Sequence, residues 1–117
     1  MRKRKYGHTK RLSLDKLSHV FSSLPYIKTA FLFGSRATGK SEARSDYDFA
    51  LDMKPIPAAT WGMQAKAWMD LCNALEVNEY DIDVVDLASA DSYLKHSIRR
   101  NHILLKGEKS DIPRLLG

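Results

Sequence analysis

Residues 31–53 read FLFGSRATGKSEARSDYDFALDM, and two apolar runs in this part of the chain enclose a polar one. The first run, residues 30–33, has the composition of a buried strand and stops at the pair Gly34-Ser35. Residues 36–45 are polar with a central glycine, which predicts a loop or a short helix. The second run alternates, as a half-buried strand does, with its apolar side chains on one parity: Tyr47, Phe49, Leu51 and Met53.

Two carboxylates stand at the start of this second strand. Ten residues separate Gly34-Ser35 from Asp46 and Asp48, which share the parity opposite to Tyr47. In a strand, residues two apart point the same way at about 6.5 Å, so their carboxylates can converge on one hard cation or bridge two. Mg²⁺ suits such a pair because it keeps other positions for water and phosphates. The plainer reading is a surface strand that turns both acids towards water.

The residues upstream favour the metal site. Gly34 allows a sharp turn and a close approach of the backbone to a ligand. Ser35 adds a hydroxyl beside the N–H groups of a strand-to-helix turn, where anions bind, and Arg36 can form charge-assisted bonds with phosphate oxygens. The chain has neither a Walker A loop nor a dinucleotide-binding glycine motif. The combination predicts a metal-dependent site for a nucleoside triphosphate.

The rest of the chain predicts an α+β fold, a small mixed β-sheet with helices packed on one face, from the order α-β-β-α-β-α-β. A first helix follows a Ser13 N-cap and stops before Pro25. A longer helix, capped by Thr60, is expected to bury one apolar stripe: Trp61, Ala65, Trp68, Cys72 and Leu75. Next come a strand at residues 80–87, a helix capped by Ser89 or Asp91 that runs through Ile98, and a last strand at residues 102–106.

The glycine–serine pair and the two carboxylates resemble the motif of a known family. Gly34-Ser35, ten residues, then Asp46-x-Asp48 is similar to the signature of the nucleotidyltransferase superfamily that includes DNA polymerase beta. The segments GSRATGKSEARSDYDFAL and YDIDVVDLASADSYLKHSIRRNHILL resemble its minimal nucleotidyltransferase (MNT) branch, over roughly residues 20–106. The resemblance implies a nucleotidyltransferase fold like the polymerase beta palm.

The resemblance also implies a third metal-binding carboxylate on a neighbouring strand. Matching the family's apolar-Asp-apolar-apolar pattern places it at Asp83, while the rival Asp86 has the opposite parity and is expected at the exit of the strand. In the implied site, Asp46, Asp48 and Asp83 are the metal-binding and catalytic carboxylates for Mg²⁺, two ions in all. The implied phosphate-binding residues are Gly34, Ser35 and Arg36. Thr38 departs from the family, which commonly has a basic residue there.

MNT proteins are commonly paired with a separate helical HEPN-domain protein, often a toxin of which the MNT protein is the antitoxin. The implied reaction is transfer of AMP from ATP, or of another nucleoside monophosphate, to a hydroxyl of that partner, with release of pyrophosphate. Two alternatives stay open. One is a binding module that neutralises or scaffolds its partner by contact alone. The other is transfer to a small molecule in an acceptor site that the partner supplies, since only 34 residues follow Asp83.

Charge divides the chain into a leader and a domain. Residues 1–11 hold six of the nineteen Lys and Arg and no acid, so a disordered leader is expected, or one that makes a weak contact with nucleic acid or an acidic partner. Residues 12–117 hold thirteen basic and fourteen acidic side chains and are expected to form one MNT domain, with direct nucleic-acid binding not favoured. With a single cysteine and no apolar run of signal-peptide or membrane-spanning length, the expected location is the cytoplasm.

Overall fold

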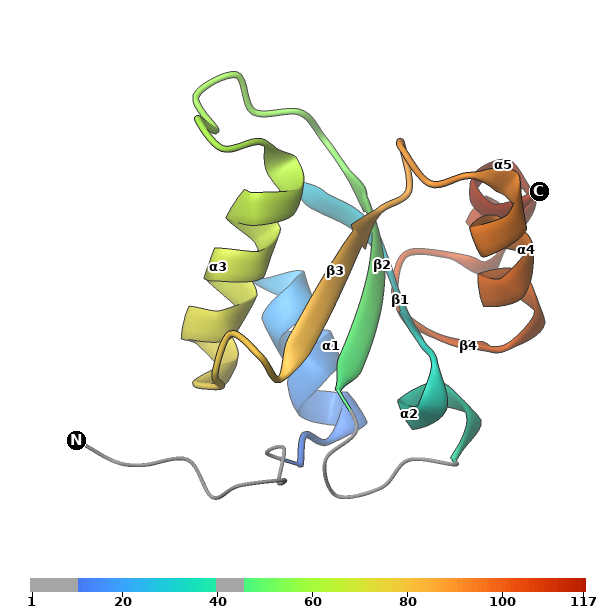
Figure 1. Ribbon diagram of the computed structural model, residues 1–117, viewed down its shortest axis with the longest axis horizontal. Helices are drawn as coiled ribbons and strands as arrows, with labels where there is room; N and C mark the ends of the chain where they lie inside the picture. Colours follow the sequence, from blue (N-terminus) through green and yellow to red (C-terminus); the bar gives the residue numbers. More distant parts are fainter. Residues whose placement is uncertain (1–10, 40–45) are drawn as a thin grey trace.

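The computed structural model of the protein describes residues 11–39 and 46–117. Its four strands form one mixed sheet in the order β3-β2-β1-β4, in which β1 runs antiparallel to β2 and β4, and β2 runs parallel to β3 (Figure 1). The elements in chain order are α1 (Leu14–Ser22), β1 (Ile27–Phe33), α2 (Ser35–Thr38), β2 (Tyr47–Met53), α3 (Met63–Leu75), β3 (Ile82–Asp86), α4 (Ser92–Arg100), β4 (His102–Lys106), the 3-10 helix η1 (Lys109–Asp111) and α5 (Ile112–Leu116). The predicted α+β fold with a small mixed sheet is confirmed.

Helices cover both faces of this sheet, so the prediction that they pack on one face is wrong. Ala30 and Leu32 of β1 belong to a core shared with α1 and α3, whereas Phe31, between them, belongs to a second core shared with α4 and α5. Figure 1 shows α1 and α3 on one side of the strands and α4 and α5 on the other. The physical reason lies in β1, where four consecutive residues, 29–32, are buried, because a strand that is apolar on both parities needs cover on both faces.

Local signals placed several boundaries correctly. The Ser13 side chain accepts a hydrogen bond from the Lys16 N–H at 3.1 Å and caps α1. Of the two caps expected before α4, Asp91 is the one used, because its Oδ1 accepts from the Leu94 N–H at 2.8 Å. Strand β4 has the predicted bounds, and β3 is shorter than predicted by residues at both ends. Helix α5 was not predicted.

The start of α3 differs from the prediction. The helix begins at Met63, after a Gly62 with a φ of 88°, so Thr60 does not cap it and Trp61 lies outside it. Trp61 is 83% exposed and is therefore not part of the core. Helical spacing cannot bury a residue that precedes the helix. Of the predicted stripe, Leu75 is fully buried, together with Ala67 and Leu71, which the prediction did not include. Trp68 and Cys72 pack against the border of this core, and Ala65 is only partly buried. Burial raises the pKa of the Cys72 thiol.

The leader expected over residues 1–11 lies outside the described residues, apart from Arg11. The extent of the predicted single domain, residues 12–117, stays a prediction. Within residues 11–39 and 46–117, no helix combines the length and the apolar character needed to cross a membrane.

Candidate active site

The glycine–serine turn lies against the carboxylate strand. β1 ends at Phe33, whose partner in the antiparallel register is Asp48. Gly34 follows with φ 75° and ψ −159°, a conformation that is essentially restricted to glycine, and α2 starts at Ser35. A Cβ built on Gly34 would collide with Asp48 Oδ2. The absence of a side chain at Gly34 therefore lets the turn and the carboxylate touch.

Pairing of β2 with β3 brings the third predicted carboxylate to the same place. In the parallel register Asp48 lies beside Asp83, and Asp46 immediately precedes β2. Burial, together with the negative charges of Asp83 and Asp46, raises the pKa of Asp48 to about 6. The structure thus brings together the three predicted carboxylates closely enough that two of them perturb the third. Asp86 ends β3 and its Oδ1 accepts from the Ala88 N–H at 3.0 Å, in the turn after the strand.

The three carboxylates do not yet form a closed metal cage. The exposed Asp83 side chain accepts a hydrogen bond through Oδ1 from the N–H of Val84 at 3.0 Å. Among the described residues, no three His, Cys, Asp or Glu side chains are already gathered as ligands of one ion. The donor set itself fits a hard cation, because it consists of carboxylate oxygens that repel one another around a half-buried Asp48.

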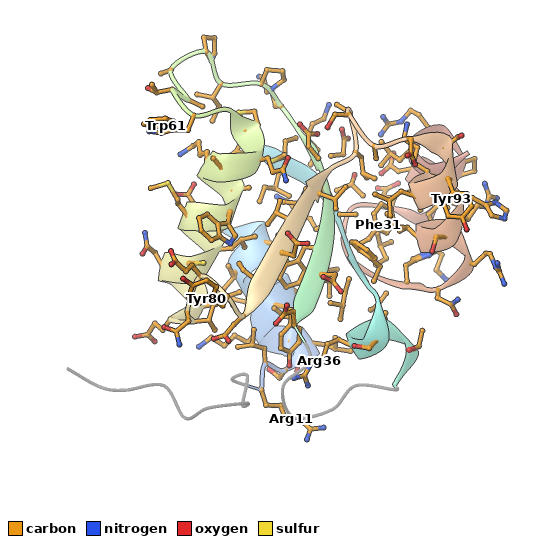
Figure 2. All side chains as sticks on the ribbon, in the orientation of Figure 1. Arg11, Phe31, Arg36, Trp61, Tyr80 and Tyr93 are labelled. Atoms are coloured by element: carbon orange, nitrogen blue, oxygen red, sulfur yellow. The ribbon has the colours of Figure 1, made fainter. Side chains whose placement is uncertain are left out.

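Arg36, expected at the phosphates, rests on an aromatic ring. Its guanidinium carbon lies 4.5 Å from the centroid of Tyr47, the residue between the two carboxylates of the strand. The Tyr47 hydroxyl in turn accepts from the Leu12 N–H at 2.8 Å, which fixes the ring. Figure 2 shows Arg36 and Arg11 at the same end of the molecule. The spacing of the motif gave no signal for this role of Tyr47, because it depends on where α2 lies over β2.

Ser35 and Thr38 occupy the single turn of α2. The Thr38 hydroxyl donates to the Ser35 carbonyl at 3.2 Å, so the residue that replaces the family's common basic side chain is engaged within its own helix. His102 has a structural role, because its Nδ1 lies 2.9 Å from the Ile98 carbonyl and its ring packs edge-on against Phe31.

The raised pKa of Asp48 predicts a pH-dependent stability of the metal-free protein. A carboxyl whose pKa is higher in the folded state stabilises the fold below its ordinary pKa near 4, and this contribution is lost as the pH rises through about 6. Solvent screens this half-buried group, so the expected effect is about 1 kcal/mol. We therefore compare the free energy of unfolding in urea of Asp48→Asn and wild type, in EDTA, at pH 4.5 and at pH 7.5. The stability of the variant relative to wild type should be about 1 kcal/mol greater at pH 7.5 than at pH 4.5. An equal difference at both pH values would contradict the assignment.

Comparison with known proteins adds to this geometry. The family model described as polymerase beta, nucleotidyltransferase, matches residues 15–111. The chain belongs to the polymerase beta nucleotidyltransferase family. It is 31% identical over 101 residues to the protein adenylyltransferase MntA of Aphanizomenon flos-aquae (strain 2012/KM1/D3), a match that covers 79% of this chain and 65% of that protein. The likeness to minimal nucleotidyltransferases seen in the sequence is thereby confirmed.

Solved structures share the fold. A toxin–antitoxin complex with AMP-PNP superimposes with a TM-score of 0.68 at 24% identity, over 90% of this chain and 82% of that one. A complex of a tri-AMPylated HEPN toxin with an MNT antitoxin from Shewanella oneidensis gives a TM-score of 0.60 at 22% identity, over 88% and 76% of the two chains. At these identities the superpositions establish the polymerase beta-like fold of the chain.

Proposed function

We propose that this protein is a Mg²⁺-dependent nucleotidyltransferase that transfers AMP from ATP to a hydroxyl group of a HEPN-domain partner, as the antitoxin of a toxin–antitoxin pair. The single observation that carries the proposal is the position of Asp48. It contacts the Gly34 turn of β1 on one side and pairs with Asp83 of β3 on the other. A phosphate-binding turn and a group of carboxylates in contact are what transfer from a nucleoside triphosphate requires.

The residues that would hold Mg²⁺ are Asp46, Asp48 and Asp83. Asp48 fits best, because it is half-buried beside two other carboxylates and ionises reluctantly in their presence. Bound there, the metal would supply neutralisation of the charge on the triphosphate.

The other groups of the site would position the substrates. The backbone at Gly34 and the hydroxyl of Ser35 would bind the β- and γ-phosphates, at a turn that leaves room because residue 34 has no Cβ. The Arg36 guanidinium, which now stacks on the Tyr47 ring, would form charge-assisted hydrogen bonds with phosphate oxygens, either from this position or after moving off the ring. Asp83 is exposed, so it would accept the proton of the attacking hydroxyl. Most of the rate acceleration would come from orientation and electrostatics.

The relatives support the donor and the acceptor class. The curated relative is named a protein adenylyltransferase, one solved relative is a toxin–antitoxin complex with AMP-PNP, and another contains an AMPylated HEPN toxin. This chain spans 65% of the length of the curated relative, so its own activity, acceptor and partner belong to the proposal.

The experiment that tests the proposal is incubation with ATP labelled at the α-phosphate, Mg²⁺ and the HEPN-domain protein that we expect the neighbouring gene to encode. We expect label on the partner and release of pyrophosphate, both abolished by EDTA. In a parallel reaction with unlabelled ATP, the partner protein that has received AMP should also lose its toxicity. Neutralisation that proceeds without any transfer of label would replace the enzyme by a binding module.

A further inference from the structure

The strand register places four residues in one row across the sheet. Phe33 of β1 pairs with Asp48 of β2 on one side and with His102 of β4 on the other, and Asp48 pairs with Asp83 of β3. Side chains of directly paired residues point to the same face of a sheet. Phe33 packs against the second core, so the row faces the side of the sheet that α4 and α5 cover.

This row lies at the border of the helical cover. The next row along the strands belongs to the second core or packs against it. Its members are Leu104, Phe31, Ala50 and Val85. In the first row Asp83 is exposed, and the other three residues are only half-buried or less well covered than Phe31 and Ala50. The first row is therefore accessible to a ligand from β3 to β4.

The charge changes sign along the row. Asp48 and Asp83 make its end on β2 and β3 acidic, whereas the exposed Arg99 and Arg100 end α4 just before His102 on β4. Helix α2, which follows the Gly34 turn, contacts both β1 and β4. Figure 1 shows α2 below α4, on the same side of the strands. The turn therefore leaves the row at its middle, with carboxylates on one side and basic residues on the other.

The His102 ring has one nitrogen turned to the protein and one open to solvent. Its Nδ1 lies 2.9 Å from the Ile98 carbonyl oxygen and 3.2 Å from that of Arg99. A lone pair there would face carbonyl oxygens, so Nδ1 carries a hydrogen and donates it. The edge-on contact with Phe31, at 5.2 Å between ring centroids, also holds the ring. Among the described residues Nε2 has no hydrogen-bond partner, and it is not shielded from solvent.

We infer that His102 binds the γ-phosphate of ATP, by a hydrogen bond that its Nε2 donates to a phosphate oxygen. The inference rests on the proposed function, in which the carboxylates hold the metal and the Gly34 turn binds the β- and γ-phosphates. Neighbouring strands are about 4.8 Å apart, so His102 lies about 10 Å from Asp48 along the row. A triphosphate that extends from the carboxylates past the turn approaches His102 with its last phosphate.

This position makes His102 a specificity-determining residue, because a nucleoside diphosphate would end before it. The ring binds the phosphate in its doubly protonated form, with Nδ1 donating to the two carbonyls and Nε2 to the ligand. Arg99 and Arg100 add attraction for the same negative charge.

Two substitutions separate the two nitrogens of the ring. His102→Asn keeps a donor near the position of Nδ1 and removes Nε2, whereas His102→Gln keeps a donor near the position of Nε2 and removes Nδ1. Calorimetric titration of the full chain in Mg²⁺ measures the Kd of AMP-PNP, as the triphosphate, and of ADP. His102→Asn should weaken binding of AMP-PNP about tenfold or more and that of ADP less than twofold, because the lost bond is to the last phosphate. His102→Gln should weaken AMP-PNP less than His102→Asn does.

A purely structural role of His102 predicts the opposite order. His102→Asn would then resemble wild type, and His102→Gln would lose stability in urea and affinity for both nucleotides equally. His96→Asn is the matched control, because His96 is exposed on α4, and it should leave both Kd values unchanged. If wild type binds neither nucleotide and transfers no label, the proposed function fails and this inference with it. If wild type binds both and transfers label, but His102→Asn shows no selective loss of AMP-PNP, only the role of His102 is overturned.

Discussion

Asp48→Asn should abolish nucleotidyl transfer, with a loss of rate of about a thousandfold or more, while the chain stays folded. Asparagine keeps the size of the side chain next to Gly34 but removes the charge at the centre of the three carboxylates. Thermal unfolding gives a second readout. Mg²⁺ with a non-hydrolysable ATP analogue should raise the Tm of wild type and leave that of the variant unchanged, because binding stabilises only a protein that can bind.

Asp52→Asn is the matched control on the same strand. Asp52 lies four residues further along β2, on the same parity, and its Oδ2 is 3.7 Å from a terminal guanidinium nitrogen of Arg114. This variant should transfer AMP at nearly the wild-type rate and keep the stabilisation by Mg²⁺ and nucleotide. Comparable losses in both variants would mean that charge on β2 in general, and not a metal site at Asp48, supports the activity.

The same pair of measurements separates Asp83 from Asp86. Asp83 pairs with Asp48 across the strands, whereas Asp86 serves the turn after β3 through Ala88. Asp83→Asn should therefore lose transfer and Asp86→Asn should retain it. If Asp86→Asn loses transfer and Asp83→Asn retains it, the third metal ligand is Asp86 and not Asp83.

The sequence was informative where one local signal determines the outcome. The apolar run that ends before Gly34 located β1, and the alternating run that follows Asp46 located β2. The Ser13 and Asp91 caps predicted where two helices start. The ten-residue gap in the motif also anticipated that the turn and the carboxylates belong together, which the contact of Gly34 with Asp48 bears out.

What the sequence did not predict depends on tertiary contacts. When a strand is apolar on both faces, its sequence does not indicate which helices pack on which face. The packing of α4 and α5 against Phe31 was therefore not predicted. Trp61 continued an apolar spacing into a segment that is not helical, and only the start of α3 at Met63 shows this. The contact of the Arg36 guanidinium with the Tyr47 ring, and the cavity that Asp83 lines together with α3, were likewise not predicted, because each is formed by elements that are separate in the sequence.

Gly34→Ala is expected to have the largest effect on stability of any single substitution at the site. Its φ of 75° and ψ of −159° cost an alanine about 1–3 kcal/mol of backbone strain, and the new Cβ also meets Asp48 Oδ2. Urea unfolding should show a loss of more than 2 kcal/mol in total. Transfer should fall as well, because relief of the collision moves either the turn or the carboxylate.

Gly39→Ala gives a collision-free reference for a positive φ. Gly39 has nearly the same φ, 76°, but its ψ of 9° lies in the left-handed helical region, and a Cβ there meets nothing within 4 Å, so we expect a cost of about 1 kcal/mol from backbone conformation alone, less than at Gly34. A double-mutant cycle of Gly34→Ala with Asp48→Ala isolates the collision, because Asp48→Ala removes the oxygens that the new Cβ would meet. A favourable coupling in the double variant would show that the turn touches the carboxylate in solution. Strict additivity would show that Gly34 is required for its backbone conformation only, and that the contact with Asp48 plays no part in the site.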